Sequence, residues 1–176
     1  MLKQRAHRPS QRRAQKGISL VESLAAILVL ALGVGGLAWT QARQLADGRD
    51  SAARAAAVLA IHDLTNRMLF NHHAVARGDY RLGWDEQPAA PGCEERRCSG
   101  TELARADLAS WRAALARSVR GGNATVFPAA EGSHRIGIAV AWPSRNAAQQ
   151  PRVLTREQHG LECPQDHLCH VVYASL

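Results

Sequence analysis

Residues 18–40 read ISLVESLAAILVLALGVGGLAWT, and this stretch decides how the chain is organised. Its 23 residues contain a single formally charged side chain, Glu22. An α-helix rises about 1.5 Å per residue, so a helix of this length crosses a hydrocarbon layer of roughly 30 Å. No second stretch of comparable length and apolarity occurs among the 176 residues, which argues against a membrane protein with several spans.

A basic segment precedes the apolar stretch. Residues 1–17 hold six Lys or Arg and no acidic residue, whereas the rest of the chain holds 16 basic and 15 acidic residues. The net charge of +7 therefore comes mostly from the N-terminus, and no basic face is left to follow a nucleic-acid backbone. By the positive-inside rule, we expect the N-terminus in the cytoplasm and everything beyond Thr40 across the membrane.

Glu22 argues against two ordinary explanations of the apolar stretch, a cleavable signal peptide and an uncleaved anchor. A signal peptide has an apolar core of about 7 to 15 residues followed by a small-residue cleavage site, and this stretch is longer and ends without a clear site. A plain anchor has no use for a carboxylate, which costs up to about 2.5 to 3.5 kcal/mol at mid-bilayer. An acidic residue in a membrane helix instead indicates a functional group that needs a partner.

The residues around Glu22 resemble the class III signal of type IV pilins and pseudopilins. The shared features are a basic leader, Gly17 before the cleavage point and Glu22 at the fifth position after it. The resemblance implies that a prepilin peptidase cuts between Gly17 and Ile18 on the cytoplasmic side and methylates the new amine of Ile18. Ile18 departs from the Phe that the family usually has. In a filament, the ammonium group of Ile18 needs a counter-charge such as Glu22 of a neighbouring subunit.

Three glycines, Gly33, Gly35 and Gly36, interrupt the best helix-forming part of the stretch. Each costs roughly 1 kcal/mol relative to Ala in a helix interior. Two explanations stay open. The glycines allow close packing of helices within the membrane, or they ease the local unwinding that many pilins undergo in a filament.

The helix is expected to continue outside the membrane, from Gln41 to about Asn71. This segment is rich in Ala, Arg and Leu and has no Pro. Two sets of residues recur at helical spacing and are expected to form the stripe on which a small head domain folds: Leu45, Ala52, Ala55 and Leu59, then Val58, Ile61, Thr65 and Met68. His72 and His73 are expected at the end of this helix, where cations favour its dipole.

Arg77 to Ser99 is predicted to be a surface loop. It contains three Gly and two Pro, mixed charges and little apolar periodicity. Arg77-Gly78-Asp79 spells a cell-adhesion tripeptide, but these common loop residues adjoin often by chance, and we assign no function to them.

A second helix and three strands are predicted after the loop. Thr101 is the candidate N-cap of the helix, Gly121-Gly122 ends it, and its core stripe comprises Ala104, Leu108, Trp111, Leu115 and Val119. Strand patterns cover Ala124–Phe127, Arg135–Trp142 and His170–Ala174, with Ile136, Ile138, Val140 and Trp142 alternating in the second. The sequence thus predicts an α+β fold, a long N-terminal helix packed on a small antiparallel sheet.

Four cysteines lie beyond the membrane segment as two close pairs, Cys93 with Cys98 and Cys163 with Cys169. In an oxidising compartment we expect disulfides, with local pairing preferred among three connectivities because each pair flanks a short polar loop. A metal site is the alternative, because thiolate and imidazole ligands gather within a dozen residues: His159, Cys163, His167, Cys169 and His170. Their spacing matches no standard zinc motif.

The end of the apolar stretch and part of the head resemble the type IV pilus modification protein PilV family of minor pilins. The matching residues are Leu32 to Ala38 with Gln41, then Asp107-Leu108 with Trp111, Leu115 and Gly121-Gly122, and the strand ending at Val140-Ala141-Trp142. The resemblance also favours pairing of Cys93 with Cys98. It implies a pilin-like fold with residues 1–17 as a cleaved leader, 18–40 as membrane and filament-core helix, 41–74 as the periplasmic half of that helix and 75–176 as the head.

The implied life history is that of a filament subunit. The chain is expected in the bacterial inner membrane with its head in the periplasm, and then in a pilus fibre that supports adhesion and twitching motility. Expected partners are prepilin peptidase, other minor pilins, the major pilin and a tip adhesin.

Catalytic, cofactor and metal sites are not expected. No phosphate-binding loop, nucleophile elbow, zinc-protease helix or paired-carboxylate pattern occurs in the sequence. Two alternatives stay open: a minor pseudopilin of type II secretion, which shares the leader and helix, and an anchored exported enzyme or binding module.

Overall fold

The computed structural model describes residues 19–129, 135–150 and 161–175. Its elements, in chain order, are α1 (Leu20–Phe70), α2 (His72–Ala76), α3 (Gly100–Ser118), β1 (Asn123–Pro128), β2 (Arg135–Pro143), the 3-10 turn η1 (Ala147–Gln149) and β3 (His167–Ser175). The predicted α+β arrangement of a long N-terminal helix and a small antiparallel sheet is confirmed. The chain divides into two compact units, Met1–Gln44 and Leu45–Leu176, and α1 contributes to both.

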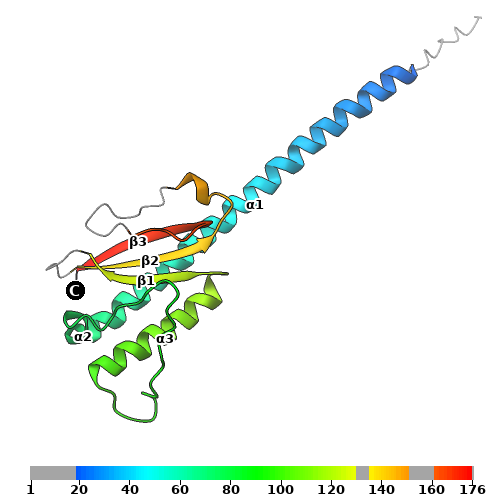
Figure 1. Ribbon diagram of the computed structural model, residues 1–176. Helices are drawn as coiled ribbons and strands as arrows, with labels where there is room; N and C mark the ends of the chain where they lie inside the picture. The colour runs from blue at the N-terminus through cyan, green and yellow to red at the C-terminus, as the bar shows by residue number, and fades with distance from the viewer. Residues whose placement is uncertain (1–18, 130–134, 151–160, 176) are drawn as a thin grey trace, which may run out of the picture. The chain divides into compact units, whose positions relative to one another are not determined.

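The sheet has the order β1-β2-β3, with both neighbouring pairs antiparallel (Figure 1). Val126 lies opposite Ile138, which lies opposite Val172, so these residues form one row across the three strands. The observed strands contain the three predicted ones and extend beyond them, most of all β3, which begins at His167.

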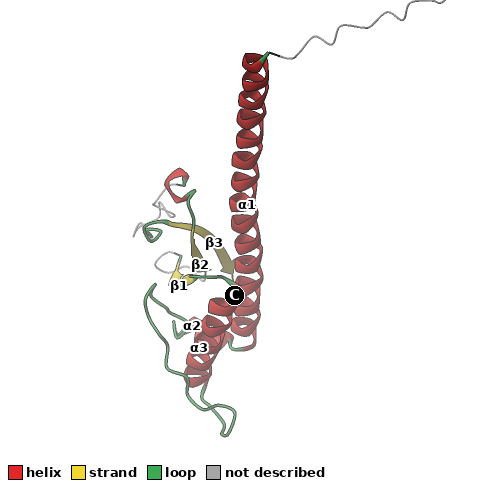
Figure 2. Ribbon diagram, turned by 90° about the vertical axis from the view of Figure 1, so that its right-hand side faces the viewer, coloured by secondary structure: helices red, strands yellow, loops and turns green. Residues whose placement is uncertain are grey.

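The core of the head lies between the second half of α1, α3 and one face of the sheet. Figure 2 shows α3 beside this half of α1. The largest fully buried side chains include Ile61, Leu64 and Met68 from α1, Leu108, Trp111 and Leu115 from α3, and Ile138 and Val140 from β2. The predicted stripe of α3 is confirmed, because each of its members is buried.

One of the two predicted stripes on α1 is wrong. Ile61 and Met68 are buried, but Leu45, Ala52, Ala55 and Leu59 are exposed, Leu59 by 71%. Leu59 and Ile61 are two residues apart, which is about 200° around a helix of 3.6 residues per turn, so one core cannot bury both. The Ala-rich sequence is apolar on both faces, and the head covers the face of Ala57, Ile61, Leu64 and Met68.

β2 is buried on both faces, although its alternation predicted one. Val140 and Trp142 join the main core, while Ala141 on the opposite face packs in a second cluster with Cys163 and Cys169. Trp84 packs against this second cluster. The small side chain of Ala141 leaves room for the sulfur atoms above the sheet.

The predicted surface loop contributes two residues to the core. Tyr80 and Leu82 are each 2% exposed. Leu82 pairs with Val126 through two main-chain hydrogen bonds of 3.1 and 2.9 Å, and its carbonyl accepts a bond of 2.7 Å from the Thr125 hydroxyl. The chain from Tyr80 to Leu82 is therefore an edge of the sheet and core rather than a loop over the surface.

The N-cap of α3 is Ser99, and the prediction of Thr101 is wrong. Ser99 Oγ accepts from the Glu102 amide at 3.3 Å, while Glu102 Oε2 accepts from the Ser99 amide at 2.8 Å. This reciprocal pair is a capping box. The hydrogen bond from Arg96, followed by those from Ser99, lowers the pKa of Glu102 to about 2. At the other end Gly121 has φ +66°, as the predicted turn requires.

Candidate functional site

The first unit is the candidate site, because its apolar surface is uncovered. Leu20, Val21, Leu24, Ile27, Leu28, Val29 and Leu30 are all exposed. They lie all round α1, whereas the helix of a water-soluble head is apolar on one face. The most apolar 18 residues of α1 include no buried residue, so by length and composition this is a helix that could span a membrane.

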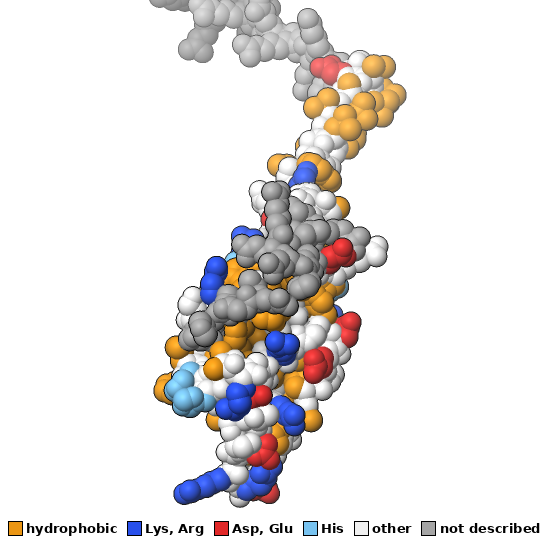
Figure 3. Space-filling view, turned by 60° about the vertical axis from the view of Figure 1, so that its left-hand side comes forward, with side chains coloured by type: hydrophobic (Ala, Val, Ile, Leu, Met, Phe, Trp, Pro, Cys, Tyr) orange, Lys and Arg blue, Asp and Glu red, His pale blue; other side chains and the backbone are white. Residues whose placement is uncertain are grey.

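Figure 3 shows the contrast between this segment and the head. Hydrophobic side chains gather along the part of α1 that precedes the head, while Lys, Arg, Asp and Glu are mixed over the visible head surface. The head face in this view carries no continuous patch of one charge. Hence the first unit presents a surface that suits a lipid or helix partner, while the visible head face carries charged side chains of both signs among hydrophobic ones.

Glu22 lies in the first turn of α1 and is exposed. Its amide donates to Ser19 Oγ at 3.2 Å, so Ser19 caps the start of the helix. The carboxylate in this turn also favours the helix dipole. Gly17 and Ile18, the predicted cleavage and methylation residues, lie outside the described residues.

The structure does not explain the three glycines. α1 stays helical through Gly33, Gly35 and Gly36. A methyl group built on any of them meets no atom within 4 Å, so contacts within the described chain do not require glycine here. Both explanations from the sequence therefore stay open.

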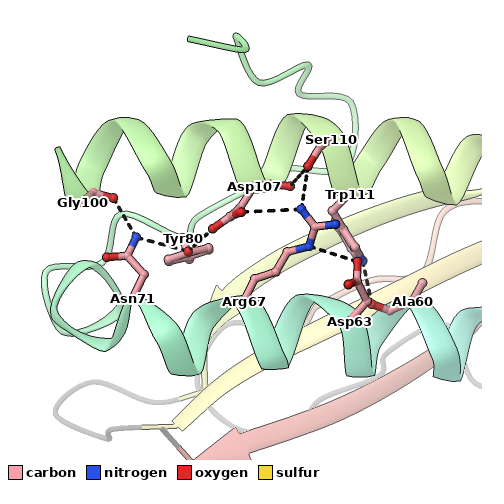
Figure 4. A network of polar contacts seen from close by, with 9 residues as sticks. All are labelled: Ala60, Asp63, Arg67, Asn71, Tyr80, Gly100, Asp107, Ser110 and Trp111. Carbon is pink, nitrogen blue, oxygen red and sulfur yellow. Dashed lines mark hydrogen bonds and ion pairs between the residues drawn. The ribbon is translucent and has the colours of Figure 1, made fainter. Parts of the chain in front are cut away.

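A polar network joins α3 to α1 in the head (Figure 4). Arg67 lies at its centre, with Nε 3.1 Å from Asp63 Oδ2 and Nη1 3.5 Å from Asp107 Oδ1. The same Nη1 donates to Ser110 Oγ at 2.7 Å. The Tyr80 hydroxyl donates to Asp107 Oδ2 at 2.6 Å, so the carboxylate of Asp107 binds both Arg67 and Tyr80.

Asn71 extends the network to the start of α3. Its Nδ2 donates to the Gly100 carbonyl at 2.8 Å and to the Tyr80 hydroxyl at 3.3 Å. Burial and the hydrogen bond to Asp107 raise the pKa of Tyr80. The polar groups in Figure 4 pair with one another. We therefore interpret the network as structural, because it holds two helices and the chain at Tyr80 in one arrangement.

Arg112 is a structural residue that sequence reasoning missed. Its guanidinium donates to the Ala124 carbonyl at 2.9 Å, the Trp84 carbonyl at 2.6 Å and Asn123 Oδ1 at 2.7 Å. It thereby joins α3, β1 and the loop at Trp84, and burial lowers its pKa. The sequence shows only a charge on a helix, since two of the acceptors are main-chain atoms that the fold brings there.

The four cysteines form two local disulfides. Cys93 is bonded to Cys98, and Cys163 to Cys169. The second bond uses both sulfurs of the alternative metal site, of which His159 lies outside the described residues. Among the described side chains, no group of three or more His, Cys, Asp or Glu is placed to hold a metal ion.

His72 and His73 lie in the short helix α2, not in the last turn of α1, so the prediction of their position is wrong. Their rings lie 4.1 Å apart between centroids.

The cell-adhesion tripeptide is engaged within the head. Arg77 Nη2 lies 2.9 Å from Asp79 Oδ2, and that oxygen accepts a 2.9 Å bond from the Thr101 hydroxyl. Asp79 therefore holds α3 near its start rather than projecting freely into solvent.

Comparisons of this chain with protein-family models, curated proteins and solved structures give no match. The functional argument consequently rests on the residues themselves.

Proposed function

We propose that this chain is a minor type IV pilin. In this proposal a prepilin peptidase cuts it after Gly17 and methylates Ile18, and the product enters the tip of a pilus with other minor pilins. There it primes assembly of the major pilin and supports a tip adhesin in adhesion and twitching motility. The chain is a substrate and a building block rather than a catalyst.

The observation that carries the proposal is the uncovered apolar part of α1 with Glu22 in its first turn. Leu24, Ile27, Leu28 and Leu32 are each at least half exposed. Such a surface is stable in lipid or among other helices, whereas its exposure to water is unfavourable. The head, by contrast, has its own buried core and two disulfides.

The mechanical step is an exchange of partners. Lipid tails are as apolar as Leu side chains, so moving from bilayer to filament exchanges lipid contacts for helix contacts at little hydrophobic cost. Direction and register then come from polar groups. The carboxylate of Glu22 against the ammonium of a neighbouring Ile18 supplies that specificity, because an unpaired charge in such surroundings is costly.

N-terminal mass spectrometry of the full chain from membranes tests the proposal, in cells with and without active prepilin peptidase. We expect a mature terminus at Ile18 carrying one methyl group, and only in cells with the enzyme. Gly17→Val should block the cut, because a side chain there obstructs a narrow protease site. The matched control Gly33→Val lies outside the signal and should be processed.

Fibres sheared from the cell surface supply the second arm. The processed chain should be found in them, and its deletion should abolish twitching. An intact Met1 terminus or a cut beyond Thr40 would overturn the proposal. Blocked secretion of exoproteins with normal twitching would redirect it to a pseudopilin.

A further inference from the structure

Trp39 and Arg43 form a pair at the end of the apolar segment. They are four residues apart and so lie on one face of α1. The guanidinium carbon of Arg43 lies 5.3 Å from the centre of the Trp39 ring, a cation–π contact. Trp39 is nevertheless 63% exposed, and the pair faces outward from the helix.

Both side chains suit the boundary between hydrocarbon and water. Indole is enriched at that level because it has an apolar body and one polar N–H. A guanidinium stacked on an aromatic ring keeps its N–H groups at the edge, where they match the oxygens of a phosphate. Within the described part of the chain, Arg43 has no ion pair with a carboxylate.

We propose that Trp39 and Arg43 dock in the phospholipid headgroup layer of the leaflet nearer the head, with Arg43 binding a lipid phosphodiester. The pair then fixes how deep α1 lies in the bilayer. This inference rests on the membrane insertion of the proposed function and adds a lipid partner and a register to it.

The register places Glu22. Trp39 lies 17 positions after Glu22, which is about 26 Å of helix at 1.5 Å per residue. The hydrocarbon core is roughly 30 Å thick, so Glu22 lies at the far boundary and not at mid-bilayer. Its carboxylate therefore reaches cytoplasmic water before assembly, at a lower cost than at the centre.

The acidic residues that follow Arg43 agree with this depth. Asp47 and Asp50 are the first acidic residues after Glu22 along the chain. Asp50 Oδ2 accepts from Ser144 Oγ at 2.7 Å and from Asn146 Nδ2 at 3.0 Å, and Asp47 Oδ1 accepts from the same amide at 3.2 Å. The polar contacts of the head thus begin about one helical turn after Arg43. At the proposed depth, this is where the helix leaves the hydrocarbon layer.

Fluorescence quenching by brominated lipids tests the depth of Trp39. The full chain is reconstituted into vesicles of phosphatidylethanolamine and phosphatidylglycerol, with bromine either near the glycerol end or near the methyl end of the acyl chains. Of the other three tryptophans, Trp111 and Trp142 are buried in the head and Trp84 packs against its second cluster, so none of them should be quenched. We expect stronger quenching by the shallow bromine and loss of that signal in Trp39→Phe.

In the Arg43→Gln variant, which keeps Trp39, the quenching of Trp39 should shift toward the deep bromine because the phosphate contact is lost. Arg49→Gln, the matched control on the same helix, should leave it unchanged. Two results would overturn this inference alone, in a chain that floats with the vesicles. One is stronger quenching of Trp39 by the deep bromine, and the other is an equal shift of the quenching in both variants. Chain that does not float with the vesicles overturns the membrane insertion of the proposed function as well.

Discussion

The indole N–H of Trp111 donates to the main-chain carbonyl of Ala60 across 2.7 Å, and this bond joins α3 to α1. Trp111 is 1% exposed, so its ring also fills the space between the two helices. Ala60 is itself a small residue that packs against the core cluster. Trp111 is thus an anchor of the head as well as a core residue.

Trp111→Phe should lower the free energy of unfolding of the head by about 1 to 3 kcal/mol, through the lost hydrogen bond and the smaller ring. Urea unfolding of the full chain in detergent, followed by near-UV circular dichroism, measures this. Trp39→Phe is the same chemical change at an exposed site and should leave the midpoint where it was. Equal midpoints for both variants would contradict the anchoring role.

Gly137 is required by the ring of Phe127 above it. A methyl group at Gly137 would overlap Cζ of that ring, and Phe127 also meets Tyr173 edge to face at 6.1 Å between centroids. Gly137→Ala should therefore displace the ring and cost about 1 to 3 kcal/mol of stability.

Gly48→Ala is the opposite case and serves as the control. A methyl group there meets nothing within 4 Å and the residue lies inside α1, so Ala should stabilise the helix by about 0.5 to 1 kcal/mol. Thermal unfolding of the two variants should thus move in opposite directions. A stabilised Gly137→Ala variant would show that the ring does not need the space.

The sequence predicted the elements well where periodicity is strong and only one face is apolar. α3 is such a case, since its buried stripe follows from the spacing of Leu108, Trp111 and Leu115. α1 is not, because Ala on several faces gives two candidate stripes, and only the folded sheet and α3 choose between them. The N-cap of α3 was missed although Ser99-x-x-Glu102 carries the signature of a capping box.

The sequence predicted those parts of the candidate site that depend on residues close together in the chain. The uncovered apolar helix and the position of Glu22 in its first turn follow from residues close together in the chain. The roles of Arg67, Arg112 and Asn71 do not, because their partners come from segments distant in sequence. Such contacts exist only once the helices have packed, and composition gives no sign of them.

His170 should make the head less stable in mild acid. It lies opposite Val140 in the register, half-buried, and burial together with the charge of Arg54 lowers its pKa. The unfolded chain then binds a proton more readily than the folded one. The head therefore keeps its full free energy of unfolding above the unfolded pKa of about 6.5 and loses part of it as the pH falls below that value.

Urea midpoints at about pH 7.5 and about pH 5.5 measure the effect, since carboxylates change little in this range. His170→Gln should flatten the difference between them, and Arg54→Gln should reduce it. His72→Gln, at an exposed site in α2, is the matched control and should keep the full difference. A pH dependence that survives in His170→Gln would assign it to another group.

The two disulfides should contribute unequally. They close loops of similar size, with sequence separations of 5 and 6, so chain entropy predicts about 2 kcal/mol for each. Cys163 and Cys169 are also buried, 4% and 3% exposed, against Ala141. The Cys169 main chain exchanges two hydrogen bonds of 2.8 Å with the side-chain amide of Gln150.

Replacing Cys163 and Cys169 by Ser should consequently destabilise the head more than replacing Cys93 and Cys98, because buried hydroxyls would then face an apolar cluster. Thermal unfolding of the two double variants compares them directly. An equal loss would mean that loop closure alone accounts for both bonds.

The proposed function gives Glu22 the role of a carboxylate for a neighbouring subunit, and the structure places it in the capped first turn of α1, so the two roles can be tested separately. Glu22→Ala and Glu22→Gln both remove the charge, so cleavage after Gly17 should continue while incorporation into fibres fails. Ser19→Ala removes the 3.2 Å cap on the Glu22 amide, at about 1 kcal/mol of helix stability, yet keeps the carboxylate. Immunoblots of sheared fibres and of membranes should find Ser19→Ala in both and the Glu22 variants in membranes alone. If Ser19→Ala fails in the same way as Glu22→Gln, the helix start and not the charge is what assembly needs.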